Sequence, residues 1–298
     1  MIGGTSVSAK VAKLTNAKDQ RASPSDTTVD RIKSTQMMRV MGPASVISFI
    51  LPSVDEFRGL NTYISTMSRK TVRVASYNIR KARGLDQIRA PERIVEVING
   101  LGADVIALQE ADMRLGERPA AVPRRMIEGE TDFEVVEVAQ SEVSLGFHGN
   151  AVLARKSLGR SSVKHIDLTG LEPRGAVRVD FELGFSFVAA HLGLLRSSRR
   201  VQLSEICAAT DDQRPTVIAG DFNEWRKAMG LEPLADGFEV HSPGQSFHAR
   251  RPVAALDRIA LSDGLALQDA GVEQGALASR ASDHLPIWAD VGFDDGAQ

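Results

Sequence analysis

Short apolar runs separated by polar or glycine-containing segments recur along the chain from Thr71 onward, and only two stretches show the three- and four-residue spacing of an amphipathic helix. Apolar, β-branched-rich runs of this length are typical of buried strands. We therefore expect strands at residues 71–78, 104–108, 133–139, 148–155, 161–167, 175–182, 185–191, 216–220, 256–261 and 286–291. Helices are expected from Pro91, which a first turn tolerates, to Leu101, and from about residue 197 to 210.

The order of these elements predicts the fold class. A strand, a helix and a strand over residues 71–108 form one α/β unit, whereas the later strands follow one another with little helix between them. This pattern indicates a β-meander rather than a doubly wound parallel sheet, so we expect an α/β (α+β) fold. After Trp225 the pattern predicts irregular chain up to about Ala249. It contains no repeat of fixed period, and it leaves open whether the chain forms two related halves in space.

Residues 1–70 differ from the rest of the chain. Ser, Thr, Lys and Asp dominate this segment, its periodicity is weak, and basic residues outnumber acidic ones. We expect residues 1–70 to be a disordered or non-essential extension and residues 71–298 to form the folded domain. Met67 stands just before the first core strand, and translation could start there, so residues 1–66 are predicted to be dispensable.

Composition excludes several classes of protein. A hydrophobic fraction of 43%, a charged fraction of 25% and a net charge of -2 are those of an ordinary soluble protein and do not indicate a nucleic-acid partner. Cys207 is the single cysteine, which excludes an intramolecular disulfide and a cysteine-based zinc site. No apolar run approaches a membrane span, and no secretory signal is evident. We expect a cytoplasmic monomer.

Polar side chains that could take part in catalysis or ligand binding lie at the ends of the predicted strands. The clearest group is G-D-F-N at residues 220–223, where an apolar strand runs directly into Asp221 and Asn223. Ligands favour the carboxyl ends of strands in α/β sheets, although Gly, Asp and Asn are also turn residues. The complete set of candidates is Asn78, Gln109, Glu110, His191, Asp221, Asn223, Asp257, Asp283 and His284.

The residue types in this set indicate hydrolysis of a phosphate ester. Carboxylates such as Glu110 are hard oxygen donors that suit Mg²⁺ or Mn²⁺, and the absence of an H-E-x-x-H helix argues against zinc. A divalent ion on Glu110 would polarise the phosphoryl oxygens. Asp257 or Asp221 could hold His284 or a water so that hydroxide attacks in line, because a histidine oriented by a carboxylate is a competent base near neutral pH. Asn223, Asn78 and His191 would donate hydrogen bonds to the non-bridging oxygens.

Basic residues near these motifs would add a local positive field for an anionic substrate, even though the whole chain is slightly acidic. They are Arg80, Lys81, Arg83, Arg196, Arg199, Arg200, Arg226, Lys227, Arg250 and Arg251.

Seven motifs, taken in order, resemble the endonuclease/exonuclease/phosphatase superfamily. They are S-Y-N-I-R at 76–80, L-Q-E at 108–110, G-N-A-V-L at 149–153, A-H-L at 190–192, G-D-F-N at 220–223, L-D-R-I at 256–259 and S-D-H at 282–284. The resemblance covers about residues 71–293. It implies a four-layered α/β sandwich of two packed, mostly antiparallel sheets, so that residues 71–298 would be a catalytic domain.

The resemblance also implies a role for each position. Asn78, Glu110 and Asp283 resemble the metal side of the site, with Glu110 the direct ligand. Asp221 resembles the water-orienting aspartate, Asn223 the phosphate-binding asparagine, and Asp257 the partner of His284. Arg174 resembles an arginine that reaches the phosphate, and His191 is shared with the deoxyribonuclease and sphingomyelinase branches rather than with the abasic-site enzymes.

The chain is therefore expected to be a metal-dependent phosphoesterase. Its substrate class stays open among nucleic acids, phospholipids or sphingolipids, and small phosphate monoesters, with inositol phosphates least favoured. A non-catalytic binding module of the same fold would require the loss of at least one catalytic position, and none is replaced.

Overall fold

The computed structural model describes residues 71–160, 162–226 and 229–293. The predictions that residues 1–70 are a dispensable extension and that translation could start at Met67 fall outside the described residues.

Two six-stranded sheets make up the described domain. The first sheet has the strand order β11-β12-β1-β2-β4-β3 and comprises β1 (Thr71–Asn78), β2 (Val105–Gln109), β3 (Phe133–Val135), β4 (Ala151–Arg155), β11 (Leu265–Val272) and β12 (Ile287–Phe293). The second has the order β5-β6-β7-β8-β10-β9 and comprises β5 (Ser162–Leu168), β6 (Arg174–Asp180), β7 (Ser186–His191), β8 (Thr216–Asp221), β9 (Phe238–His241) and β10 (Asp257–Ser262).

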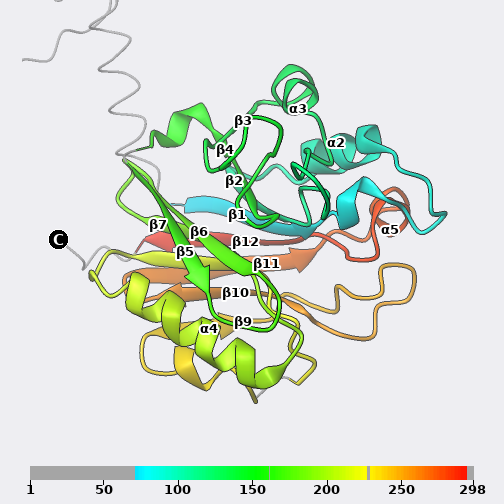
Figure 1. Cartoon of the computed structure of the whole chain (residues 1–298). Coiled ribbons are helices and arrows are strands. Elements are labelled where there is room, and N and C mark those ends of the chain that lie inside the picture. The colour runs from blue at the N-terminus through cyan, green and yellow to red at the C-terminus, as the bar shows by residue number, and fades with distance from the viewer. Residues whose placement is uncertain (1–70, 161, 227–228, 294–298) are drawn as a thin grey trace, which may run out of the picture. The chain divides into compact units, whose positions relative to one another are not determined.

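Helices connect the strands and cover the outer faces of the sheets (Figure 1). The α-helices are α2 (Pro91–Gly100), α3 (Arg124–Glu130), α4 (Arg196–Ala209) and α5 (Ala278–Ala281), and the 3₁₀ turns are η1 (Arg80–Ala82), η2 (Lys156–Leu158) and η3 (Glu232–Leu234). Helices α2 and α3 pack on the first sheet and α4 packs on the second. The four layers are therefore helix, sheet, sheet and helix.

Side-chain alternation along the strands builds three apolar clusters. In β1, Val74 joins the cluster between the two sheets, whereas Tyr77 joins the cluster under α2, because successive strand side chains point to opposite faces. Ile206 of α4 packs on Ile218 of β8 in the third cluster. Each fully buried Val, Leu or Ile side chain contributes about 2 kcal/mol, so the strands buried on both faces hold the site edge rigidly.

Each sheet has a parallel pair of strands near its centre. Strand β1 pairs with β2 and is joined to it through α2, and β7 pairs with β8 and is joined to it through α4. Every other pair of named strands is antiparallel. The described part of the chain thus forms two similarly built halves.

This architecture confirms the predicted fold of two packed, mostly antiparallel sheets. Several local predictions were wrong. The strand expected at 133–139 ends at Val135, because the next valines are buried in irregular chain, and the strand expected at 148–155 begins only at Ala151. The region expected to be irregular after Trp225 contains η3 and β9. Strand β11 was missed because only one of its eight side chains is buried, so polar residues interrupt its sequence.

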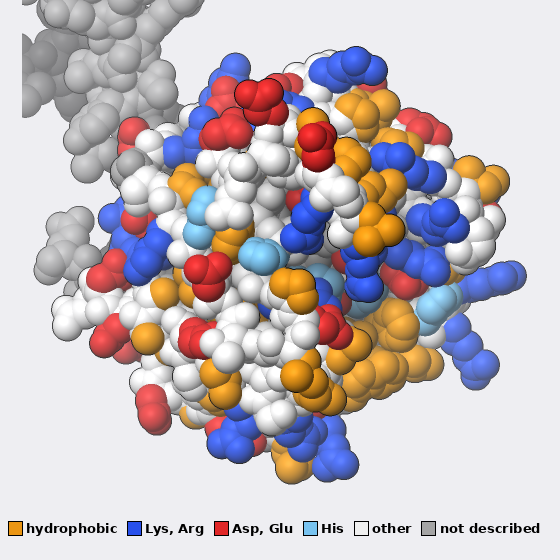
Figure 2. Space-filling model, in the orientation of Figure 1, with side chains coloured by type: hydrophobic (Ala, Val, Ile, Leu, Met, Phe, Trp, Pro, Cys, Tyr) orange, Lys and Arg blue, Asp and Glu red, His pale blue; other side chains and the backbone are white. Residues whose placement is uncertain are grey.

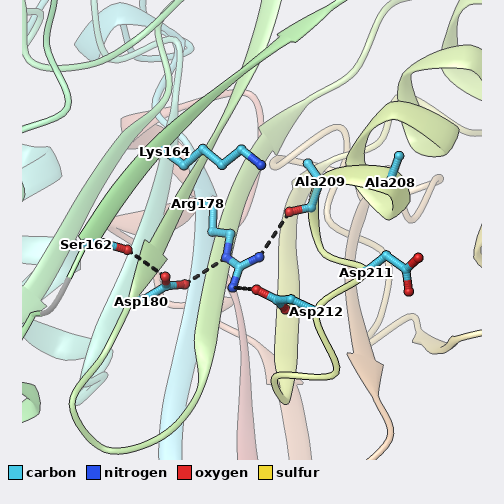
Figure 3. Close-up of a pocket in the computed structure, with 8 residues that line it drawn as sticks. All are labelled: Ser162, Lys164, Arg178, Asp180, Ala208, Ala209, Asp211 and Asp212. Carbon is cyan, nitrogen blue, oxygen red and sulfur yellow. Dashed lines mark hydrogen bonds and ion pairs between the residues drawn. The ribbon is translucent and has the colours of Figure 1, made fainter.

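A group of polar residues lies where β5 begins and β6 ends. This is the opposite end of β6 from Arg174. Figure 3 shows the guanidinium of Arg178 donating to Asp180, to Asp212 and to the carbonyl of Ala209. These residues line a hollow of about 340 Å³. These bonds tie the sheet to the end of α4. The contacts are structural and lie at the opposite end of β6 from the strand ends that carry the predicted site.

Within the described ranges, no helix combines the length and the apolar character needed to cross a membrane.

Candidate active site

Strand register brings the predicted residues to one edge of the domain, which we call the catalytic edge. Asn78 is opposite Gln109 where β1 and β2 end, and Asp221 is opposite both His191 and Asp257 where β7 and β8 end and β10 begins. The S-D-H motif lies on the turn before β12. The carboxyl ends of the two parallel pairs therefore meet at one place, as expected for ligand sites in α/β sheets.

Asp221 joins the two sheets. Its Oδ2 accepts a hydrogen bond from Asn78 Nδ2 at 3.0 Å, and its Oδ1 accepts the backbone N–H of Asn223 at 2.9 Å. His191 Nε2 lies 3.5 Å from the same Oδ2. Gly220 permits this arrangement, because a Cβ there would stand 1.9 Å from the carbonyl oxygen of Ala190 on the neighbouring strand. The glycine of G-D-F-N is thus needed for the close approach of β7 and β8.

His284 forms a buried pair with Asp257. Its Nδ1 lies 2.8 Å from Asp257 Oδ2, which also accepts the hydroxyl of Ser246, and its Nε2 lies 3.7 Å from Asp221 Oδ2. Burial lowers the pKa of His284, but the charges of Asp257 and Asp221 outweigh burial and raise the pKa to about 9. His284 is therefore an imidazolium at neutral pH, with Nε2–H as a donor. Of the two acids predicted to orient it, Asp257 makes the direct hydrogen bond.

His191 has the opposite charge state. Burial lowers its pKa to about 3, with Asp221 offsetting part of the effect and Arg174 and His284 adding to it. It is consequently neutral at all ordinary pH values. Two histidines beside one carboxylate thus differ in charge because only His284 has a second carboxylate against its ring.

The two acids predicted to bind a metal ion, Glu110 and Asp283, each lie beside a basic side chain. Glu110 pairs with the ammonium of Lys81, and Asp283 Oδ2 lies 3.2 Å from Arg80 Nε. Burial lowers the pKa of Lys81 to about 8, and Arg114, Arg174 and Arg80 lower it further against the opposing effect of Asp283. Each of the two carboxylates is paired with a basic side chain, and the Asn78 amide oxygen accepts the backbone N–H of Arg80 at 3.1 Å. Carboxylate and amide oxygens are hard donors of the kind that Mg²⁺ or Mn²⁺ prefers.

Asp221, Asp257 and His284 bring ligand atoms within 4.8 Å of one another. The Nδ1 atom of His284 already makes a 2.8 Å hydrogen bond with Asp257. This contact suits proton and hydrogen-bond chemistry at the trio.

The backbone at this edge is unusual. Left-handed φ values occur at Arg80 (45°), Lys81 (57°), Glu110 (52°) and Asn223 (52°). Such values are uncommon for residues other than glycine and cost about 1–2 kcal/mol each. Surrounding hydrogen bonds hold them, since the N–H of Lys81 donates to the carbonyl of Glu110 at 3.1 Å and Asn223 Nδ2 donates to the carbonyl of Leu192 at 2.9 Å. Strain of this kind clusters at functional sites.

Two candidates behave differently from the rest. Gln109 is fully buried and accepts a hydrogen bond from Ser76, so it supports the sheet and does not face the site. Arg174 pairs with Glu172 at 2.6 Å, but its buried Nε has no hydrogen-bond partner within the described structure. The positive charge of Arg174 lowers the pKa of both Lys81 and His191, so Arg174 adds to the positive field at the catalytic edge.

Some supporting residues were not among the sequence candidates. Ser246 holds Asp257, and Ser282 donates to the carbonyl of Asn78 at 2.7 Å, which joins the S-D-H turn to β1. Ser282 could have been found from the motif itself. Ser246 gives no signal in the sequence, because it lies in a segment with neither strand nor helix periodicity.

Comparison with known proteins decides the family. The profile described as "Endonuclease/Exonuclease/phosphatase family" matches residues 75–284. The chain belongs to this family. The endonuclease/exonuclease/phosphatase motifs span the whole catalytic edge, from Asn78 to His284, and members of the family are hydrolases that act on phosphate esters.

The individual relatives compared with this chain have low sequence identity to it. Uncharacterized protein YbhP of Escherichia coli K12 is 28% identical over 161 residues, which cover 49% of this chain and 63% of YbhP. The mannosyl-6-phosphatase Bt3783 of Bacteroides thetaiotaomicron has a TM-score of 0.60 at 16% identity, covering 74% of this chain and 100% of that one. TDP2 of D. rerio, complexed with a single-strand DNA product, has a TM-score of 0.58 at 16% identity, covering 75% and 100%. The two structures share the fold with this chain.

Proposed function

We propose that the chain is a divalent-metal-dependent phosphoesterase, acting as a monomer in the cytoplasm, with Mg²⁺ or Mn²⁺ as its cofactor. One observation carries the proposal. A buried His284–Asp257 pair, the Asp221 carboxylate and the two acids Glu110 and Asp283 lie around Asn78 at a single edge. This combination of a charged donor, a carboxylate base and a hard oxygen site suits attack of water on phosphorus.

Glu110, Asp283 and the amide oxygen of Asn78 would hold the metal ion. When bound, the ion would neutralise charge on the phosphoryl oxygens and on the leaving oxygen. The protein's own side chains would orient the water, move its proton and bind the phosphate.

Asp221 would orient the attacking water and accept its proton. Its Oδ2 already accepts from Asn78 and its Oδ1 accepts the N–H of Asn223, so two hydrogen bonds fix the carboxylate. The oxygen of water would bond to phosphorus as the bond from phosphorus to the leaving oxygen breaks. The leaving oxygen would take up a proton from solvent water, and the proton on Asp221 would return to solvent. His284 remains charged and donates its Nε2–H to a phosphoryl oxygen, rather than acting as the base.

Three further residues would bind the substrate phosphate. Neutral His191 and the Asn223 amide can donate without adding charge, whereas Arg174 supplies the buried Nε–H that has no partner in the described structure. A donor that strengthens its hydrogen bond in the transition state is worth about 3 kcal/mol. Removal of any one of them should therefore lower turnover by about 100-fold.

The proposal is tested with a small soluble diester, bis(p-nitrophenyl) phosphate, and separate Glu110→Gln and His284→Ala variants. Each variant should keep the circular dichroism spectrum and lose at least about 100-fold in kcat/KM. The matched control is Glu182→Gln, which removes an exposed carboxylate from the opposite end of the second sheet and should leave the rate unchanged. Equal rates in all four proteins would refute the assignment.

A further inference from the structure

Exposed hydrophobic side chains are concentrated at the catalytic edge. Nine of the twelve large ones that are exposed in the described chain lie on its loops: Ile88, Leu115, Val143, Leu171, Leu194, Leu195, Trp225, Met229 and Val253. The other three are Val163, Val201 and Leu267, on β5, α4 and β11. Scattered exposed apolar residues are normal in any protein, but a concentration around one site marks an interaction surface.

The five on the second-sheet side form one surface, which we call the apolar rim: Leu194, Leu195, Trp225, Met229 and Val253. Hydrogen bonds and ring contacts connect the three loops that carry them. Asn223 Nδ2 donates to the carbonyl of Leu192, which joins the first two loops. The ring of Trp225 packs edge-on against Phe247 at 5.8 Å, and the N–H of Val253 donates to the carbonyl of Phe247 at 2.7 Å.

The apolar rim borders the reacting groups directly. The ring of Phe247 lies 5.0 Å from the ring of His284, and Trp225 lies on the outer side of Phe247 with 61% of its surface exposed. Leu194 and Leu195 begin three residues after His191. A substrate whose phosphate sits on His284 and His191 would therefore place its remaining groups against the apolar rim.

Buried charge connects two of the three rim loops. Glu224 accepts from Arg199 at 2.6 Å and from Arg196 at 3.2 Å, while Arg199 also donates to the carbonyl of Leu194. The exposed Leu194 and Trp225 therefore lie beside an anchored backbone.

Basic side chains predominate on the same loops. Segments 192–200, 222–230 and 242–256 contain one acidic residue, Glu224, which is buried and paired, and the exposed Glu232 that follows lies 3.6 Å from Arg200. Exposed arginines on these segments are Arg200, Arg226, Arg250 and Arg251. Figure 2 shows basic side chains lying among hydrophobic ones on the right of the molecule, where Figure 1 places the loop before β10.

Exposed leucine, valine and tryptophan side chains among mostly basic neighbours match the interface of a bilayer that carries anionic lipid. The apolar tips enter the acyl boundary and the guanidinium groups remain at the headgroups. A nucleic acid fits this surface less well. Its phosphates would satisfy the arginines, but Leu194, Leu195 and Val253 would find no apolar partner, and Trp225 is the single exposed aromatic residue of the rim.

We infer that the apolar rim docks on an anionic phospholipid surface, and that the phosphate ester hydrolysed at the catalytic edge is a lipid headgroup presented there. The second part of this inference, hydrolysis of a lipid headgroup, rests on the proposed phosphoesterase activity. Binding to the lipid surface itself requires only the rim.

The binding experiment uses the full chain and sedimentation with phosphatidylcholine vesicles that either contain or lack phosphatidylglycerol. The phosphatidylglycerol vesicles should bind at least about tenfold more strongly, and high salt should weaken that binding. Joint replacement Leu194→Ser, Leu195→Ser and Val253→Ser should reduce binding by at least about tenfold. The matched control is Val163→Ser with Leu267→Ser, which alters two equally apolar exposed residues outside the catalytic edge and should bind like the unchanged chain.

Activity is then compared on the same vesicles, on plasmid DNA and on soluble bis(p-nitrophenyl) phosphate. We expect the triple rim variant to retain hydrolysis of the soluble diester and to lose at least about tenfold on phosphatidylglycerol vesicles. Absence of vesicle binding by the unchanged chain, or cleavage of plasmid DNA with no hydrolysis on vesicles, would overturn the inference while leaving the phosphoesterase proposal intact. Vesicle binding without hydrolysis of any substrate would overturn the proposed activity instead.

Discussion

Replacing Asp257 by asparagine should shift the charge of His284 without removing its hydrogen-bond partner. The amide oxygen of asparagine can still accept from Nδ1, which lies 2.8 Å from the carboxylate in the present structure. The negative charge, however, is gone. Burial of the ring stays and Asp221 remains 3.7 Å from Nε2, so the balance that raises the pKa of His284 to about 9 is lost.

The size of the shift follows from the distances. Two unit charges about 4 Å apart interact by about 4 kcal/mol at an effective dielectric constant of about 20. At about 1.4 kcal/mol for each pKa unit, loss of that interaction lowers the pKa by about 3 units. The pKa of His284 should therefore fall from about 9 to about 6 in the variant.

Nuclear magnetic resonance titration of the His284 ring in metal-free protein measures this shift directly. The pH–rate profile gives a second readout, since the alkaline limb of kcat/KM should move to lower pH when the imidazolium deprotonates earlier. Asp263→Asn, in the exposed turn after β10, is the matched control. An unchanged pKa in Asp257→Asn would refute the reasoning that carboxylate charge sets the protonation of His284.

The same shift affects stability. The pKa of His284 in the folded chain is raised above the ordinary value of 6.5, so its contribution to the free energy of unfolding is complete below about pH 6.5 and is lost as the pH rises through about 9. In Asp257→Asn, this contribution of His284 to the free energy of unfolding should no longer fall between about pH 6.5 and about pH 9. Urea unfolding at several pH values will show whether it does.

Three other substitutions test separate features, each against urea or thermal unfolding. Gly220→Ala should destabilise the fold by about 3 kcal/mol or more, because the new methyl group meets the Ala190 carbonyl, whereas Gly237→Ala has open space and should be nearly neutral. Asn223→Ala should be less stable than Asn223→Gly by about 1 kcal/mol, since φ is 52°, and equal stabilities would contradict the strain assigned there. Arg178→Met should cost about 3 kcal/mol by leaving Asp180 and Asp212 without their shared guanidinium, yet should preserve kcat, and a large loss of kcat would contradict its separation from the site.

Much of the fold was predictable because the central strands are buried on both faces. Residues 71–78, 185–191 and 216–221 are rich in buried apolar side chains, so both their existence and their ends were found within a residue or two. Strand β11 shows the converse. It lies at a sheet edge with one of its eight side chains buried, and the pairing with β12 that defines it cannot be seen in local sequence.

The sequence predicted which residues gather at the candidate site, but not the protonation states of its two histidines. Ordered motifs identified the residues that gather around Asn78. The resemblance assigned Asp257 as the partner of His284, and Asp257 makes the direct bond. The residue types alone left Asp221 as an alternative, because sequence periodicity does not fix the register of β8 and β10. The opposite protonation of His191 and His284 depends on burial and on two contacts between distant segments, and Ser246 joins the site from irregular chain.

The most direct test of the central claim is release of p-nitrophenolate from bis(p-nitrophenyl) phosphate by the purified chain, before and after removal of divalent metal with a chelator. The account predicts turnover that chelation abolishes, that Mg²⁺ or Mn²⁺ restores, and that His284→Ala lowers by at least about 100-fold. Turnover that persists after chelation and in His284→Ala would contradict it.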